Sequence, residues 1–205
     1  MIFRNLIAIG VGLSLSACLS VLPDPKPAST VYRLSTTLAD NPPMETAEVI
    51  RVDRPTANQI YNTTDIVLSS DPQTLSVIAQ ANWAEAAPVM IQTALVDRLD
   101  ASSRFVGIIP TSGARTDTRL HLTVSNFEAS FDNGPESAPL GIVSYRVTYA
   151  RADDRKLLGT YAVRKTARAE SINVSSVVAA IDAANKAAMT DIVRWLETQQ
   201  TPGMF

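Results

Sequence analysis

Two segments in the second half of the chain alternate apolar and polar residues, and they constrain the possible folds more than any other feature. From residue 143 to 149 an apolar side chain occupies every odd position, which predicts a strand with one buried face. Between residues 119 and 131 the apolar positions change from even to odd: Leu120, Leu122 and Val124, then Phe127, Ala129 and Phe131. A strand cannot exchange its faces without an extra residue, so the sequence predicts a β-bulge near Ser125 and Asn126.

Shorter apolar runs predict further strands on both sides of these two. They lie at residues 31–34, 49–52, 66–68, 105–109 and 161–168, and residues 75–79 form either another strand or the lead into a helix. The segment 161–168 alternates less cleanly and carries three basic residues. That composition is typical of a strand that faces solvent or lies at the edge of a sheet.

A first helix is predicted where apolar residues recur at helical spacing between positions 91 and 99. Asn82 and Glu85 stand three apart before it, as in a capping box. Pro88 follows them, and a proline inside a helix removes a backbone hydrogen bond. The helix is therefore expected either to have a kinked first turn or to begin near Ala87.

A last helix is predicted, with Ser175 or Ser176 as its N-terminal cap. Its apolar face carries Val178, Ile181, Ala184, Ala188, Ile192 and Trp195. Strands, a helix, more strands and a second helix follow one another without an internal repeat. This order predicts an α+β fold, with a mixed, largely antiparallel sheet and two main helices packed on one face, in a single domain over residues 31–200.

The amino terminus has the layout of a secretory signal. Arg4 precedes an apolar run, Leu6–Leu15, which is shorter than the about 20 residues that a membrane-spanning helix needs. The next residues complete a sequence that resembles the bacterial lipobox: Leu15, Ser16, Ala17 and Cys18. In such signals the cysteine thiol receives a diacylglycerol, the chain is cut before the cysteine, and the new amino group is acylated. Residues 1–17 are therefore expected to be a lipoprotein signal peptide and Cys18 the lipid attachment site; the alternative is an ordinary signal with an incidental cysteine.

Residues 18–30 are interpreted as the lipidated cysteine followed by a tether. Three alternating prolines between positions 23 and 27 favour an extended polyproline II conformation. Several acyl chains on one cysteine hold a protein stably to a membrane, which a single chain does not. Leu19 and Ser20 lack the aspartate that retains lipoproteins at the inner membrane of enteric bacteria. The periplasmic side of the outer membrane is the expected location, ahead of the inner membrane.

Composition excludes several classes of function. The formal net charge is −2, so the chain lacks the basic surplus of an electrostatic nucleic-acid binder. The densest basic stretch, Arg164 to Arg168, is expected to be a solvated strand face. Cys18 is the one cysteine in the chain, so the mature domain forms no internal disulfide and depends on its hydrophobic core for stability.

The sequence offers no catalytic, metal or cofactor site. His121, the single histidine, alternates with leucines in a strand and is expected to be structural; without a free cysteine it cannot complete a zinc site. No serine lies in a Gly-x-Ser-x-Gly turn. The acid pairs Glu45 with Glu48 and Asp153 with Asp154 lie in polar, turn-like stretches and are expected to be solvated. We expect no enzymatic activity.

Four stretches occur in an order that is similar to one known family: "VYRL" at 31–34, "VIRVDRP" at 49–55, "TLSVIAQANWAEAAPVMIQTALVDRL" at 74–99 and "LHLTVSNFEASF" at 120–131. Together, behind a lipobox, they resemble the ABC-type transport auxiliary lipoproteins, the PqiC-like family, over roughly residues 30–197. One departure is "TANQIY" at 56–61, where a more hydrophobic stretch leading to an arginine is expected.

The resemblance implies a non-catalytic subunit of an ABC/MCE-type lipid transport system that docks at its outer-membrane end. The implied partners are an MCE-domain protein and ABC transporter subunits, and homo-oligomers are possible. Trp83 is a candidate partner contact, because tryptophans are enriched at binding hot spots; the alternative is that it packs onto the sheet. A structural or regulatory outer-membrane lipoprotein, which activates a cell-wall synthase or assists outer-membrane assembly, is the competing class. A periplasmic lipid carrier would require an apolar cavity.

Overall fold

The computed structural model describes residues 28–36 and 45–199. In chain order its elements are β1 (Thr30–Tyr32), β2 (Glu48–Val52), β3 (Thr56–Ala57), the short 3-10 helix η1 (Gln59–Tyr61), β4 (Asp65–Asp71), β5 (Thr74–Trp83), α1 (Ala87–Asp100), β6 (Phe105–Ile108), the 3-10 helix η2 (Pro110–Ser112), β7 (Thr118–Ser130), β8 (Leu140–Arg151), β9 (Leu157–Arg168) and α2 (Val174–Gln199).

The strands of the described residues form one mixed sheet, which confirms the expected α+β class. The longest pairs, β7 with β8 and β8 with β9, are antiparallel, as is the β4–β5 hairpin. The shorter pairs are parallel: β1 with β5, β2 with β6, and β2, β3 and β4 with β7. The parallel part is larger than the order of the elements predicted, because strand direction depends on the crossover connections rather than on the residues within a strand.

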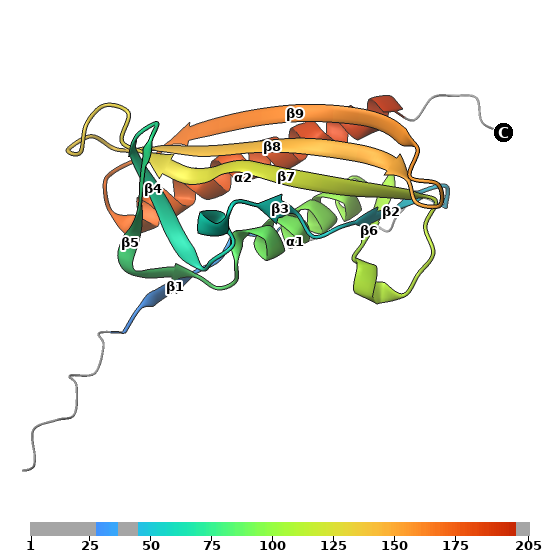
Figure 1. Cartoon of the computed structure of the whole chain (residues 1–205), viewed down its shortest axis with the longest axis horizontal. Coiled ribbons are helices and arrows are strands. Elements are labelled where there is room, and N and C mark those ends of the chain that lie inside the picture. Colours follow the sequence, from blue (N-terminus) through green and yellow to red (C-terminus); the bar gives the residue numbers. More distant parts are fainter. Residues whose placement is uncertain (1–27, 37–44, 200–205) are drawn as a thin grey trace, which may run out of the picture.

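Both α-helices lie on the same face of the sheet (Figure 1). Helix α2 packs along β8 and β9, and α1 packs against β6, β2 and α2. Strands β7, β8 and β9 lie in front of α1 and α2 in this view, so the face that they turn toward the viewer is covered by neither of these helices. No helix in the described part of the chain combines the length and the apolar content needed to cross a membrane.

The core lies between the sheet and the two helices. Its largest fully buried side chains include Trp83, Phe105 and Phe127. Glycine at position 141 allows β8 to approach α2 closely, since a Cβ atom there would lie 2.6 Å from the carbonyl carbon of Ala180. The predicted bulge is confirmed: Val124 pairs with Tyr145 but Asn126 pairs with Ser144, so Ser125 is the extra residue.

The starts of both helices differ from the predicted caps. Asn82 lies within β5, so the capping box with Glu85 is wrong and residues 75–79 form a strand. Helix α1 begins at Ala87, which is the second of the two expected starts, and Pro88 lies in its first turn, where a proline breaks no hydrogen bond. At α2 the capping residue is Asn173, whose Oδ1 atom accepts a hydrogen bond of 2.8 Å from the backbone N–H of Ser176.

Candidate interaction surface

The site residues predicted from the sequence lie either outside the described residues or in the core. Cys18 and the rest of the lipobox, Leu15, Ser16 and Ala17, are outside the described residues. Trp83 is 2% exposed at the end of β5, and its ring centroid lies 5.5 Å from that of Phe127. A buried ring of this kind cannot contact a partner at the surface, so Trp83 is a core residue, as in the alternative interpretation.

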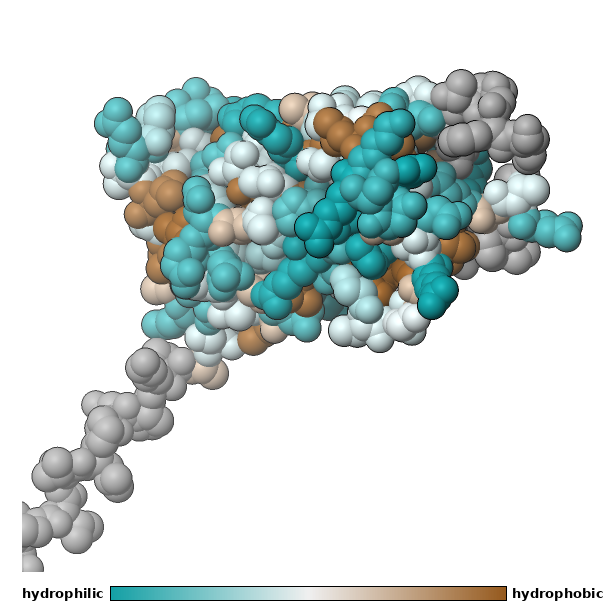
Figure 2. All heavy atoms as spheres, turned by 45° about the vertical axis from the view of Figure 1, so that its right-hand side comes forward, coloured by the Kyte–Doolittle hydropathy of each residue, from teal (hydrophilic) through white to brown (hydrophobic). Residues whose placement is uncertain are grey.

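The uncovered face of β7, β8 and β9 is instead the most distinctive surface of the domain, and we call it the outer face. Its rows follow from the strand register. Across β7, β8 and β9 they are His121–Thr148–Thr160, Thr123–Arg146–Ala162, Asn126–Ser144–Arg164 and Glu128–Ile142–Thr166. Hydroxyl, amide and guanidinium groups therefore dominate a face whose opposite side is apolar. In Figure 2 hydrophilic side chains spread over the visible surface, and hydrophobic ones form smaller patches.

Two arginines of the outer face have carboxylate partners. Arg119 Nε donates a 2.8 Å hydrogen bond to Oδ2 of Asp53, and Arg168 Nη2 donates one of 2.8 Å to Oδ2 of Asp132. The hydrogen bond from Arg168 holds the pKa of Asp132 below its usual range. Each of these arginines at the two ends of the face therefore has a carboxylate beside it, although Asp53 also pairs with Arg51 at 3.3 Å.

Arg146 and Arg164 have no carboxylate partner among the described residues. They are diagonal neighbours, because Arg146 on β8 pairs with Ala162, two residues before Arg164 on β9. Both side chains are exposed. Diagonal neighbours in an antiparallel pair lie about 7–8 Å apart at Cα, within reach of each other's long side chains. The centre of the outer face thus carries two adjacent, uncompensated positive charges.

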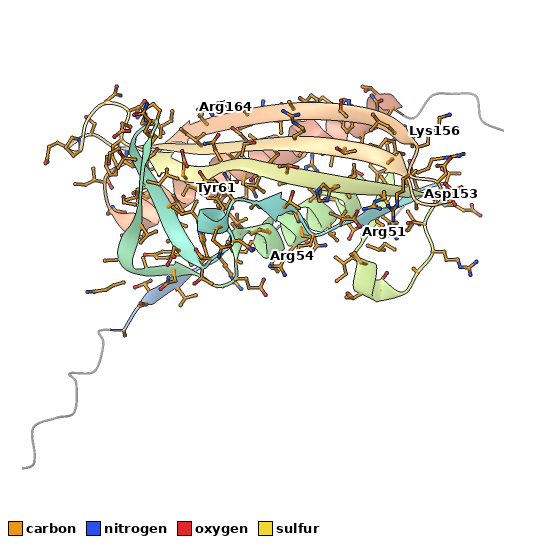
Figure 3. The ribbon with its side chains drawn as sticks, in the orientation of Figure 1. Arg51, Arg54, Tyr61, Asp153, Lys156 and Arg164 are labelled. Carbon is orange, nitrogen blue, oxygen red and sulfur yellow. The ribbon has the colours of Figure 1, made fainter. Side chains whose placement is uncertain are left out.

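A shallow pocket of about 220 Å³ lies between these two arginines; its lining includes Ser125, Ser144, Arg146 and Arg164. Arg164 Nη1 donates hydrogen bonds to Oγ of Ser144, at 3.2 Å, and to Oδ1 of Asn126, at 3.3 Å. Both acceptors are neutral, so they orient the guanidinium without cancelling its charge. Figure 3 shows Arg164 on β9 in the view of the uncovered face.

The bulge in β7 connects this pocket to a buried acid. Asn126 Nδ2 donates to Oε1 of Glu128 at 3.3 Å, while its Oδ1 atom accepts from Arg164. Glu128 is 6% exposed and accepts a hydrogen bond from the hydroxyl of Tyr61 in η1, which covers it. Burial, and then the neighbouring Glu128, raises the pKa of Tyr61. Tyr61 therefore covers Glu128, and Asn126 links the carboxylate of Glu128 to the guanidinium of Arg164 through one hydrogen bond to each.

The other expected polar residues are also placed by the structure. Glu48 is not a solvated turn residue: it lies on β2, and its Oε1 atom accepts hydrogen bonds of 2.6 Å from Thr118 Oγ1 and from the Tyr149 hydroxyl. Asp153 and Asp154 lie in an exposed turn, as expected. His121 Nε2 lies 3.3 Å from Thr56 Oγ1 on the neighbouring β3, a contact that is compatible with a structural role. Among the described residues no three His, Cys, Asp or Glu side chains are grouped closely enough to hold a metal ion.

A second surface feature is a groove along α1, which is bordered by residues 33–36 in one part and by α2 in the other. Two adjoining pockets of about 200 and 270 Å³ share Ser35 and Ala94 in their linings. The backbone N–H of Ser35 donates a 3.0 Å hydrogen bond to Oδ1 of Asp182 on α2, which ties the segment after β1 across the groove. Each pocket taken alone is smaller than the about 300–1,000 Å³ that is usual for small-molecule sites.

Sequence inspection missed the Arg146–Arg164 pair. It treated Arg164 as one of several solvated strand residues and gave Arg146 no role. The available signal was the alternation itself, which places Arg146 and Arg164 on the outward face of their strands. The pairing register that makes them neighbours, however, cannot be predicted from the sequence of either strand alone.

Comparison with known proteins identifies the family. Residues 32–193 match the family model described as "ABC-type transport auxiliary lipoprotein component". The chain belongs to this family. Membership supports a non-catalytic role in ABC-type transport for a membrane-anchored lipoprotein. No curated protein sequence matches the chain.

Two solved structures show the same fold as this auxiliary lipoprotein. A protein from Xanthomonas campestris superposes with a TM-score of 0.72 at 21% identity, covering 83% of this chain and 96% of that one. A second structure, of a protein described as uncharacterized, gives a TM-score of 0.65 at 12% identity, covering 82% of this chain and 99% of that one. At these identities the likeness establishes the architecture alone.

Proposed function

We propose that this auxiliary lipoprotein is the docking subunit of an ABC/MCE-type lipid transport system, held at the periplasmic side of the outer membrane. The observation that carries the proposal is the family match over residues 32–193 together with the lipobox that precedes it. The domain would act by binding partners, without bond chemistry. Its partners would be an MCE-domain protein and ABC transporter subunits.

The anchor part of the proposal concerns residues 1–30. Signal cleavage before Cys18 would remove residues 1–17, and acylation of the thiol and of the new amino group would leave several lipid chains on one residue. Several chains give stable membrane attachment. Cys18 and Thr30, the first residue of β1, are 12 positions apart, and an extended chain of that length reaches about 40 Å. The domain would therefore stay within this distance of the membrane, and the tether alone would not fix which face of the domain turns toward it.

The competing proposal is a regulatory lipoprotein that activates a cell-wall synthase or assists outer-membrane assembly. It shares the anchor, the tether and the α+β domain, so the two proposals differ in the partner. A third role, the periplasmic lipid carrier, would differ from both in requiring an apolar cavity that encloses a lipid.

The test is native mass spectrometry of the full-length lipoprotein, purified from bacterial membranes in mild detergent with its bound proteins. The expected result is an MCE-domain protein or an ABC transporter subunit in the complex, and a lipoprotein mass above that of the polypeptide beginning at Cys18 by the mass of its acyl chains. The same spectrum counts the lipoprotein copies in each complex and so tests homo-oligomerisation.

A Cys18→Ser variant is the matched control for the anchor, and it is expected to remain uncleaved and to be absent from the outer-membrane fraction. An unmodified thiol at Cys18 in the native protein would contradict the anchor. A murein synthase or a barrel-assembly protein as the stable partner would replace the transport proposal with the regulatory one.

A further inference from the structure

We infer that the centre of the outer face is a phosphate-binding surface, through which the domain lies on anionic phospholipids of the membrane that holds its anchor. The proposal goes beyond docking to transport partners, because it assigns a ligand class to Arg146, Arg164 and the pocket between them. Its local evidence is independent of which protein partners the lipoprotein has.

The charges of the outer face favour an anion. Arg119 and Arg168 have carboxylate partners in Asp53 and Asp132, whereas Arg164 donates only to the neutral side chains of Asn126 and Ser144. Glu128, the carboxylate nearest to them in the strand register, is covered by Tyr61 and hydrogen-bonded to it. Neither Arg146 nor Arg164 has an ion pair among the described residues, so the exposed centre of the face presents two guanidinium groups in a chain whose formal net charge is −2.

The groups around the pocket match phosphate chemistry. A guanidinium presents paired N–H donors that fit two oxygens of a phosphate, and Ser125 and Ser144 add hydroxyl donors on the same face. Asn126 and Ser144 hold Arg164 in place through its Nη1 atom, which leaves its other N–H groups for a ligand. Arg146 makes no hydrogen bond or ion pair within the described residues.

The shape of the site selects a lipid surface over free phosphate. The pocket is shallow and lies on an open sheet face, so an isolated phosphate ion would be contacted from one side and would keep most of its water. A membrane presents many phosphates at once, and a tether raises their effective concentration at the domain. The about 40 Å reach of residues 18–30 is comparable to the about 40 Å length of β8, which is 12 residues long, so the tether is long enough to let the face lie flat.

The experiment uses the full acylated lipoprotein in micelles of a neutral sugar detergent. The protein is titrated separately with dihexanoylphosphatidylglycerol, dihexanoylphosphatidylcholine and inorganic phosphate, and binding is followed by calorimetry and by the NMR signals of the arginine Nε–H groups. We expect saturable binding of the phosphatidylglycerol that weakens with added salt, shifts in the Arg146 and Arg164 signals, and at least fivefold weaker binding of the other two ligands.

Two double variants of equal charge change separate a site from a general charge effect. Arg146→Gln with Arg164→Gln is expected to weaken phosphatidylglycerol binding at least tenfold. Arg115→Gln with Arg194→Gln removes two exposed arginines from other surfaces and is expected to change it less than twofold. Arg146→Lys with Arg164→Lys keeps the charge but loses the paired donors, and is expected to give an intermediate loss. Circular dichroism and the thermal midpoint report whether each variant is folded.

Three results would overturn the proposal. Equal loss of binding in both Gln variants would show a nonspecific charge effect. Equal affinity for inorganic phosphate and phosphatidylglycerol would remove the lipid from the assignment. If the Arg146 and Arg164 variants bound lipid normally but lost the proteins that co-purify with the wild type, the face would be a protein-docking surface. None of these results alters the test of the proposed function, which depends on partner identity and on the mass of the anchored chain.

Discussion

The two faces of the β7–β8–β9 sheet are made from alternate residues of the same strands, yet one face is apolar and buried and the other is polar and accessible to solvent. On the inner face Val143, Tyr145 and Val147 pack under α2 and are almost fully buried. On the outer face Ser144, Arg146 and Thr148 occupy the positions between them and retain access to solvent. A displacement of one residue along β8 thus separates a packed core from a charged surface.

This difference indicates a division between the two faces: the inner face stabilises the fold, and the outer face is available for binding. The inner face must exclude water and match the shape of α2, so small changes in volume there cost stability. The outer face has little packing to lose, and its arginines can be devoted to recognition. If this division is correct, substitutions on the inner face alter the free energy of unfolding, and substitutions on the outer face alter binding alone.

The largest expected effect follows truncation of the inner layer at Ile181 on α2, which has no exposed surface. Ile181→Ala is expected to lower the free energy of unfolding by about 3–4 kcal/mol, because it removes buried methyl groups and leaves a cavity. Urea unfolding followed by circular dichroism measures the change. The outer-face control, Thr166→Ala, is expected to change stability by less than about 0.5 kcal/mol. Similar losses of unfolding free energy in both variants would contradict the proposal that the inner face, and not the outer face, stabilises the fold.

The second largest effect is expected from Gly141→Ala, a variant that tests the close approach of β8 to α2. Gly141→Ala would bring a Cβ atom within 2.7 Å of the carbonyl oxygen of Ala180, which is backbone and cannot rotate away. We expect a loss of about 2–3 kcal/mol in urea unfolding. Gly159→Ala is the matched control, since its nearest neighbours are side-chain atoms of Gln199 and Trp195 at 3.0 Å, a longer approach to side chains rather than to backbone. If Gly159→Ala were less stable than Gly141→Ala, β8 would not approach the backbone of α2 as closely as 2.7 Å at position 141.

A smaller effect concerns the polar contact inside the inner layer. The Tyr145 hydroxyl donates a 2.8 Å hydrogen bond to Oδ1 of Asn185, which is 1% exposed. Tyr145→Phe leaves that oxygen without this donor and is expected to cost about 1–2 kcal/mol at pH 7. Tyr161→Phe is the control, because Tyr161 stacks on Trp195 and its hydroxyl has no hydrogen bond in the described residues. A neutral Tyr145→Phe variant would mean that water replaces the lost donor.

The same tyrosine predicts a pH dependence. Burial raises the pKa of Tyr145 well above its usual value of 10.0. Above pH 10 the unfolded chain releases this proton and the folded domain keeps it, so stability falls as the pH rises. The stability gap between wild type and Tyr145→Phe should therefore narrow by about 1.4 kcal/mol at pH 11. Urea unfolding at pH 8 and pH 11 measures the gap, and a gap that stays constant would contradict the raised pKa.

The smallest effect is expected on the outer face itself. Arg146→Gln and Arg164→Gln should each change the free energy of unfolding by less than about 0.5 kcal/mol, because neither arginine has an ion pair in the described residues. Thermal unfolding of the single variants checks this. A large loss from either would mean that the outer face also stabilises the fold, and the two faces would then differ less than proposed.

Local patterns predicted much of the framework. The change of alternation between Val124 and Phe127 located the bulge, because period-two geometry allows no other way to keep both apolar sets on one face. The basic residues of β9 indicated a solvent-facing or edge strand, and it lies at the edge; Pro88 allowed a kinked first turn or a start near Ala87, and α1 begins at Ala87. Each of these signals acts within a few residues of its own position.

Other expectations failed where distant strands decide the outcome. Asn82 has a sequence context that is compatible with a helix cap, but it pairs with Val31 of β1 and Asp65 of β4, and these ladder contacts extend β5 to Trp83. Glu48 was expected to be solvated, yet Thr118 and Tyr149 from two other strands hydrogen-bond to it. The partners of both residues are too remote in sequence for local propensity to reveal them.

The sequence by itself determined the strand and helix periods and the bulge, since each of these depends on neighbouring residues; the lipobox at residues 15–18 stays a prediction of the same local kind. Only the tertiary structure decided that short parallel strands complete the sheet, that Trp83 is buried, and that Arg146 and Arg164 share a pocket. Those outcomes depend on pairing register and on which face α2 covers. Both are fixed by the packing of the whole domain, in which a shift of one residue would exchange the core and the charged surface.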